Sequence, residues 1–149
     1  MSEVEIDPQT GLVQVVRYSN VNDVGRVVNP MIVRGQLDGG IVQGLGQALM
    51  EHMVYDPDSG QPVSGSLMDY AAPRSDIVAC EFVTEMNETV PCKNNPLGVK
   101  GVGELGTIGA APSVVNAVAD ALARAGKPEK AATLQMPLTP AKVWEVLNG

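Results

Sequence analysis

The residues best suited to chemistry lie in a glycine-rich stretch, residues 95–109, in which five of the fifteen positions are glycine. Because glycine lacks a Cβ atom, such a chain can bring its N–H and C=O groups directly against a ligand. Lys100 and Glu104 are the only charged residues in this stretch. A carboxylate among bare amides is suited to accept a proton, so Glu104 is predicted to be a general base.

Residues 101–106 also match G-x-G-x-x-G, the pattern of dinucleotide-binding loops. Three features disfavour that interpretation. Such a loop should follow a buried strand, but a turn-forming run, residues 91–96, precedes it. Glu104 places a negative charge where a phosphate would bind, and Asp120, near the place of a ribose ligand, falls within a predicted helix. A nicotinamide-dinucleotide-binding domain is therefore kept only as an alternative.

Residues 95–104, followed by residues 106–112, closely resemble a signature of the xanthine dehydrogenase, aldehyde oxidase and carbon monoxide dehydrogenase family. The signature lies near the C-terminus of the large, molybdenum-binding subunit. Residues 23–30 and 35–49 resemble other parts of the same region. Since the similarity runs from residue 21 to residue 147, it covers the last part of a much larger subunit.

The resemblance implies roles for individual residues. In this family the glutamate of Val-Gly-Glu is the active-site base beside the molybdenum, and here it is Glu104. The glutamine of a Gly-Gln pair early in a helix hydrogen-bonds the pterin, and here it is Gln36. The Lys100 side chain could pair with Glu104 or with a cofactor phosphate. Four backbone amides are expected to fix the reactive end of the cofactor, those of Lys100, Gly101, Val102 and Gly103.

Four residues of the predicted first helix share one face, because Gln36, Gly40, Gln43 and Gln47 follow helical spacing. A side-chain amide both donates and accepts hydrogen bonds, which suits the edge of a pterin ring. Gln43 and Gln47 are expected to lie behind the direct contacts or at an interface. Each glycine in a helix costs about 1 kcal/mol relative to alanine. The glycines of this helix therefore indicate a close approach, either by another helix or by a ligand.

The same resemblance implies a molybdenum hydroxylase, an oxidoreductase that hydroxylates an aldehyde or N-heterocycle carbon with oxygen from water. Its cofactor would be molybdopterin in the cytosine dinucleotide form, with no metal ligand on this chain. Residues 1–149 would form one domain, the C-terminal segment of the large subunit. The partners would be the rest of that subunit, an iron–sulfur subunit, an FAD subunit and a small-molecule substrate. The alternative is a non-catalytic fragment or assembly module that is competent only with a partner chain.

Composition limits the other possibilities. Seventeen acidic and ten basic residues give a net charge of −7, which argues against binding to nucleic acid. No continuous apolar run reaches the roughly 18 residues that span a bilayer, and the N-terminus lacks the features of a signal peptide. A cytoplasmic protein without a membrane span is expected. Cys80 and Cys92 lack the spacing of a metal site and are expected to be reduced and structural.

The expected fold is α+β, with a mixed sheet packed with about three helices, as part of the larger molybdenum-binding domain. Asn29 and Pro30 are a cap and first position for a helix that should carry His52 in its last turn. The first six residues are expected to be too few to pair with the strand that follows. In the last helix, Trp144 is expected to pack inward. The predicted strands are residues 12–18, 77–86 and 131–136, and the predicted helices are residues 30–53, 112–125 and 139–147.

Overall fold

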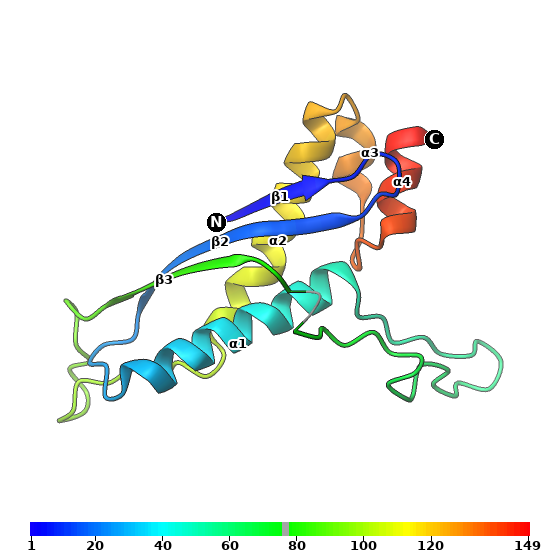
Figure 1. Ribbon diagram of the computed structural model, residues 1–149. Helices are drawn as coiled ribbons and strands as arrows, with labels where there is room; N and C mark the ends of the chain where they lie inside the picture. The colour runs from blue at the N-terminus through cyan, green and yellow to red at the C-terminus, as the bar shows by residue number, and fades with distance from the viewer. Residues whose placement is uncertain (76–77) are drawn as a thin grey trace.

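The computed structural model describes residues 1–75 and 78–149 and shows a three-stranded sheet packed against helices (Figure 1). The strand order is β1-β2-β3, with β1 antiparallel and β3 parallel to β2. The α+β class with a mixed sheet is thereby confirmed. The elements are β1 (Ser2–Ile6), β2 (Val13–Asp23), α1 (Pro30–Leu49), β3 (Glu81–Asn87), α2 (Leu105–Arg124), α3 (Pro128–Thr133) and α4 (Pro140–Asn148).

The N-terminal hairpin corrects one expectation, because β1 does pair with β2 from Ser2 to Ile6. A tight turn makes this possible, since the Gly11 amide donates to the Asp7 carbonyl at 2.8 Å. Gly11 has a φ of 73°, a conformation that glycine adopts without strain. The predicted strand at residues 12–18 is real and continues to Asp23. That longer strand leads directly into the segment that supports the glycine-rich loop.

The third strand is shorter than predicted at its start, because β3 runs from Glu81 to Asn87. The prediction began at Ile77, which lies outside the described residues. On the helix-facing side of the sheet, Phe82 and Thr84 stand beside Tyr18 and Asn20 of β2. The covered face is thus apolar at Tyr18 and Phe82 and becomes polar one pair further along.

Helix α1 begins where predicted, because Asn29 caps it by accepting from the Ile32 amide at 3.1 Å. It ends at Leu49 rather than near Met53, where the Met50 and Glu51 amides both donate to the Gly46 carbonyl. His52 therefore lies beyond the helix and is exposed, so its placement in the last turn was wrong.

Helix α2 starts at Leu105, directly after Glu104 and well before the predicted start at Pro112. Pro112 lies inside the helix, where it removes one hydrogen bond. Burial of Ala110, Ala111 and Val114 offsets that loss, since packing contributes more to helix stability than propensity does. By length and composition alone α2 could span a membrane, which the sequence did not suggest. Its buried face packs against α1 and β1, as in a core helix.

The core lies between the sheet and the two long helices (Figure 1). The C-terminal helices close its end, and they carry two corrections. Residues 131–136 were predicted as a strand, but Pro128 starts the short helix α3, which buries Ala131 against α2. In α4, Trp144 is 46% exposed, and Val146 rather than Trp144 turns inward with Val143.

Residues 51–75 form an arm that projects from the body of the molecule (Figure 1). Its first part is a hairpin, in which Tyr55 and Pro62 pair and the Val63 amide donates to the Val54 carbonyl. Its second part is a turn that leaves Leu67 84% and Met68 96% exposed. The arm therefore offers apolar side chains that nothing among the described residues covers.

Candidate active site

The site is built on the contact between α1 and α2, which approach closely through glycine. A Cβ atom on Gly40 would lie 3.0 Å from the Thr107 amide nitrogen, and one on Gly44 would lie 2.5 Å from the Ala110 Cβ. The Thr107 hydroxyl donates to the Gly40 carbonyl at 3.0 Å. Because Gly40 faces Thr107 and Gly44 faces Ala110, both helices run in the same direction along the contact.

This register places Gln36 and Glu104 toward the same end of the molecule. Gln36 lies one helical turn before Gly40, so it is level with the residues just before Glu104. The Gln36 side chain is exposed and makes no hydrogen bond to any described residue. Gln43, which is exposed, instead accepts from the Thr107 hydroxyl at 3.4 Å, at the edge of the contact between the helices. Gln36 and Glu104, the two principal predicted site residues, thus lie at the same end of the molecule although they come from different elements.

The glycine-rich loop is fastened to the end of β2. The Lys100 amide donates to the Val24 carbonyl at 3.0 Å, and the Arg26 amide donates to the Gly98 carbonyl at 3.0 Å. The Lys100 ammonium contacts Asp23 Oδ2 at 2.6 Å. Of the two partners considered for Lys100, Glu104 is therefore not the one it meets in this chain. Asp23, which the sequence did not indicate, holds it.

Asp23 is also bound by the main chain. The Gly25 amide donates to its Oδ1 atom at 3.0 Å, so both carboxylate oxygens accept a hydrogen bond. The Lys100 side chain first, and the Gly25 amide second, hold the pKa of Asp23 below its ordinary value of 3.8. Asp23 is consequently ionised at neutral pH and keeps the Lys100 side chain turned toward β2.

Beyond Lys100, at residues 101–103, the loop amides are unpaired and the glycines have no close neighbours within the part of the chain that the structure describes. The amides of Gly101, Val102 and Gly103 donate to no acceptor among the described residues. A Cβ atom on Gly101 or Gly103 would meet nothing within 4 Å. Three consecutive N–H groups are therefore available to a ligand or to a segment that this chain does not contain. The two glycines among them leave space for such a partner to approach. The Lys100 amide, which was expected to join them, is used by Val24.

Glu104 stands at the junction of this loop and α2. It occupies the N-cap position of the helix, yet its side chain caps no amide and is exposed. Its carbonyl accepts from the Thr107 amide at 3.1 Å, which fixes its backbone. The carboxylate is thus free to face a ligand while its main chain is held. The loop also lacks the preceding strand that a dinucleotide site requires, since Val99 forms only an isolated bridge with Gly25.

No three His, Cys, Asp or Glu side chains gather as a metal site within residues 1–75 and 78–149. A pocket of 540 Å³ lies near the C-terminal end of α1, away from Gln36. It is lined by apolar residues such as Leu45 and Leu138, and by Cys80, whose pKa is raised mainly by burial. Cys80 and Cys92 are both free thiols, as predicted. The chain therefore offers an exposed carboxylate and hydrogen-bond donors at one end and an apolar pocket at the other.

Comparison with known proteins shows the family of this chain. Residues 1–78, just over half of the chain, match the molybdopterin cofactor-binding domain family. The chain belongs to that family. Its relatives are molybdenum-binding subunits of the xanthine dehydrogenase type, so the family resemblance is confirmed.

Two relatives of this molybdopterin-binding domain come from Paenarthrobacter nicotinovorans. The gamma subunit of the 6-hydroxypseudooxynicotine dehydrogenase complex is 39% identical over 99% of the chain and 18% of its own length. The large subunit of nicotine 6-hydroxylase is 42% identical over 98% of the chain and 17% of its own length. The crystal structure of quinoline 2-oxidoreductase from Pseudomonas putida 86 superposes with a TM-score of 0.85 and 40% identity. It matches 97% of this chain and 17% of that one, so the domain spans less than a fifth of these proteins.

The residues present fit a pterin cofactor. Three unpartnered amides at 101–103 and the unpartnered Gln36 amide are donors and acceptors of the kind that a pterin edge requires. The open glycines leave room for a planar ring system to approach. The sequence indicated these residues but missed Asp23, which is 77 positions from Lys100. Asp23 begins a segment, residues 23–30, that resembles the family, but nothing in the sequence paired it with Lys100.

Proposed function

We propose that this chain is the C-terminal domain, residues 1–149, of the molybdenum-binding subunit of a molybdenum hydroxylase. The supporting observation is the bare loop at 101–103, which ends in the exposed carboxylate of Glu104 on the same end as Gln36. The reaction class is hydroxylation of an aldehyde or N-heterocycle carbon with oxygen from water. Relatives named for nicotine and quinoline support a heterocyclic substrate.

In this proposal each part of the site has one task. Gln36 and the amides of Gly101, Val102 and Gly103 bind and orient the cofactor, and Glu104 removes the proton from the water-derived hydroxyl that attacks the substrate. The cofactor, when bound, supplies the redox centre that takes up the two electrons. Lys100 is assigned to anchoring the loop through Asp23, because its side chain and amide are both engaged within the chain.

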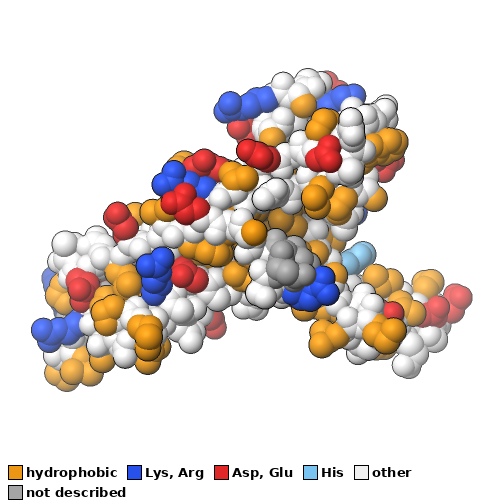
Figure 2. All heavy atoms as spheres, in the orientation of Figure 1, with side chains coloured by type: hydrophobic (Ala, Val, Ile, Leu, Met, Phe, Trp, Pro, Cys, Tyr) orange, Lys and Arg blue, Asp and Glu red, His pale blue; other side chains and the backbone are white. Residues whose placement is uncertain are grey.

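The cofactor form and the partners belong to the same proposal. We assign the cytosine dinucleotide form of molybdopterin, with iron–sulfur and FAD groups on partner subunits in the cytoplasm. The rest of the molybdenum-binding subunit covers this domain in the assembled enzyme. Figure 2 shows hydrophobic side chains at the surface where α1 begins and on the arm, as expected for covered surfaces. They include Met31 at 78% exposure and Met68 at 96%.

The alternative, that the chain is an assembly module without activity of its own, also rests on these surfaces. A domain spanning less than a fifth of its relatives brings only part of the cofactor contacts. Molybdenum analysis separates the two possibilities. Metal bound by the chain alone supports an autonomous site, whereas metal acquired only with the rest of the subunit supports assembly.

The role of Glu104 is tested by Glu104→Gln in the assembled enzyme. Turnover should fall by about 10²- to 10⁴-fold, the usual contribution of a general base, while molybdenum content stays constant. Glu145→Gln, an exposed change on α4, is the control and should leave turnover unchanged. Undiminished turnover of Glu104→Gln would refute the assignment.

The role of Gln36 is tested by Gln36→Ala, which should lower molybdenum content. Gln47→Ala is a matched control, because Gln47 is exposed on the same helix and has no hydrogen-bond partner among the described residues. Gln47 lies three turns further from the loop, so its loss should leave metal content unchanged. Equal metal content in both variants would exclude a cofactor contact by Gln36.

A further inference from the structure

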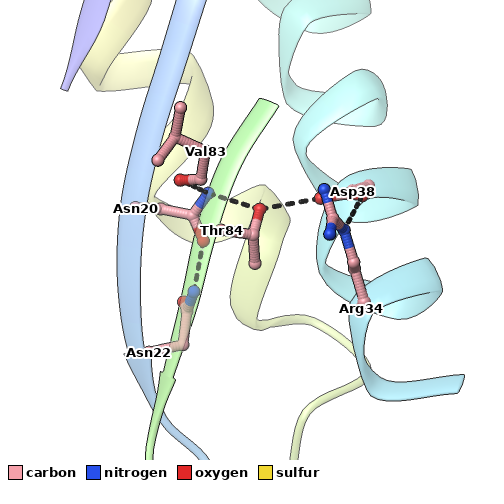
Figure 3. Close-up of polar contacts among 6 residues, drawn as sticks. All are labelled: Asn20, Asn22, Arg34, Asp38, Val83 and Thr84. Carbon is pink, nitrogen blue, oxygen red and sulfur yellow. Dashed lines mark hydrogen bonds and ion pairs between the residues drawn. The ribbon is translucent and has the colours of Figure 1, made fainter. Parts of the chain in front are cut away.

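A row of hydrogen bonds joins α1 to β3 and, through β3, to β2 (Figure 3). The Thr84 hydroxyl donates to Asp38 Oδ1 at 2.8 Å and accepts from Asn20 Nδ2 at 3.0 Å. Asn20 also accepts from Asn22, and Arg34 contacts Asp38 Oδ2 at 3.4 Å. We call this row, comprising these five residues, the polar strut. Thr84 is its centre, because its single hydroxyl serves both the helix and the strand.

The strut meets α1 at Asp38, next to Leu37, where the buried part of the helix begins. No residue of α1 before Leu37 is buried, and Met31 and Ile32 are 78% and 56% exposed. Gly35 and Gly39 contribute no side chain to hold the helix. Before Leu37, where Val33 is partly buried and no residue is fully buried, α1 is therefore held mainly by the cap at Asn29 and by the polar strut. Elsewhere α1 is held by its packing against α2.

The strut can also set the direction in which Gln36 points. Residues two apart in a helix differ by about 200° in direction, so Gln36 and Asp38 lie on opposite sides of α1. Asp38 faces β3 through Thr84, and Gln36 faces away from the sheet. A bond that holds Asp38 against the sheet thus opposes rotation of this turn, and rotation of this turn would change the direction of the Gln36 side chain.

A sheet face that packs against helices is normally apolar. Here Asn20 and Thr84 replace the apolar pair Tyr18 and Phe82 at the next inward-facing position. Burying polar groups here costs free energy unless they are paired. Thr84 is paired within the strut, and Asn20 is paired within the strut and with the Val83 carbonyl, to which its Nδ2 donates at 3.3 Å. The change in polarity occurs at the end of the sheet that carries the loop, which fits a role in the site.

We propose that Thr84 and Asp38 are positioning residues that fix the first turns of α1 and thereby aim Gln36 at the cofactor. The inference rests on the cofactor contact proposed above for Gln36. Neither residue touches the cofactor in this proposal. Their effect passes through the orientation of one helical turn.

The test uses Thr84→Val in the assembled enzyme, since valine keeps the branched shape but removes both hydrogen bonds. Thr84→Ser should restore them, and Thr133→Val on α3 is a control, because Thr133 bonds only to the nearby Lys130 carbonyl. Hydrogen exchange of amides 33–38 should accelerate by about tenfold in Thr84→Val, while amides 44–49 keep their rates. Molybdenum content should fall as in Gln36→Ala, and Thr84→Ser should recover both properties.

Two results would overturn the inference while leaving the proposed function intact. One is unchanged exchange at amides 33–38 in Thr84→Val. The other is full molybdenum content in Thr84→Val when Gln36→Ala has lost metal. If exchange accelerates but Gln36→Ala retains all its metal, the cofactor contact itself fails, and the aiming role falls with it. The exchange measurement needs no active cofactor, so the two failures are distinguishable.

Discussion

Glycine serves two different purposes in the helix contact and in the loop beside it. In the contact, a Cβ atom on Gly106 would lie 2.2 Å from the Leu37 carbonyl oxygen, and one on Gly44 would meet Ala110. In the loop, a Cβ atom on Gly101 or Gly103 would meet nothing. The first group is required by the fold of this chain. Gly101 and Gly103 are not required for packing within the chain. The open space beside them can instead admit a ligand or another segment.

The comparison shows that glycine content alone does not locate a site. Gly46 illustrates the point, because it lies in α1 but faces Glu51 and Pro73 of the arm rather than α2. Packing between helices thus explains Gly44 but not Gly46. What distinguishes the loop is the combination of open glycines, unpartnered amides and an exposed carboxylate.

The largest effect on stability is expected from Gly106→Ala. The added methyl group would collide with backbone atoms of α1, which cannot move aside as a side chain can. The free energy of unfolding should fall by about 1–3 kcal/mol or more, as in other overpacked cores. Denaturant unfolding followed by circular dichroism measures it.

Gly109→Ala is the matched control in the same helix, because its nearest neighbour is the Tyr18 hydroxyl at 3.9 Å. Alanine should stabilise this helix by up to about 1 kcal/mol. Equal stability changes in the two variants would mean that close approach does not distinguish these glycines.

Gly103→Ala is expected to affect stability little but cofactor binding strongly. Its free energy of unfolding should change by less than about 0.5 kcal/mol, since the site is open. Cofactor retention in the assembled enzyme should nevertheless weaken by roughly tenfold, because the methyl group enters the space that the loop leaves for the ligand. Molybdenum content after dialysis is the measurement. A normal content would assign the open glycines to some other contact.

The smallest effect should follow Lys100→Met, which removes the partner of Asp23. The pKa of Asp23 is lower in the folded state than its ordinary value of 3.8. The pair with Lys100 therefore stabilises the folded protein at pH values above 3.8. That contribution disappears as the pH falls through the folded-state pKa. The variant should therefore unfold more easily at pH 7 and match the wild type well below pH 3.8.

Hydrogen exchange at residues 98–103 would show whether the loss of the pair is local to the loop. Arg124→Met is the control, since it breaks an exposed pair with Asp120 of comparable length, 2.9 Å, away from the loop. Persistence of a stability difference at low pH would show that Lys100 acts other than through the Asp23 charge.

Local signals in the sequence predicted part of this fold. The Asn29 cap, strand β2 and helix α4 follow from residues close to one another along the chain. The prediction failed where distant packing decides the outcome. Helix α2 extends back to Leu105 because Gly106 fits against α1, and α3 is a helix because Ala131 packs on α2.

The site divides in the same way. Glu104, Gln36 and the loop amides were recognisable from a short motif and its family resemblance. Their supports were not, because Asp23 meets Lys100 across 77 positions and Thr84 meets Asp38 across 46. A single sequence carries no pattern for such pairings, because each polar residue looks ordinary in its own strand or helix and its partner lies far along the chain.

The shared direction of α1 and α2 has an electrostatic consequence. Each helix carries a partial positive charge at its N-terminus, and both N-termini point toward the end that bears the loop. Helix α1 has no acidic residue at its cap or in its first turn, whereas α2 carries Glu104 at its N-cap, where the carboxylate already lies at the positive end of the helix. A chain with a formal net charge of −7 thus keeps one place, the start of α1, where an anion gains about 0.3–1 kcal/mol from the helix dipole. The backbone itself can draw a phosphate-bearing molecule to a protein whose side chains would otherwise repel it.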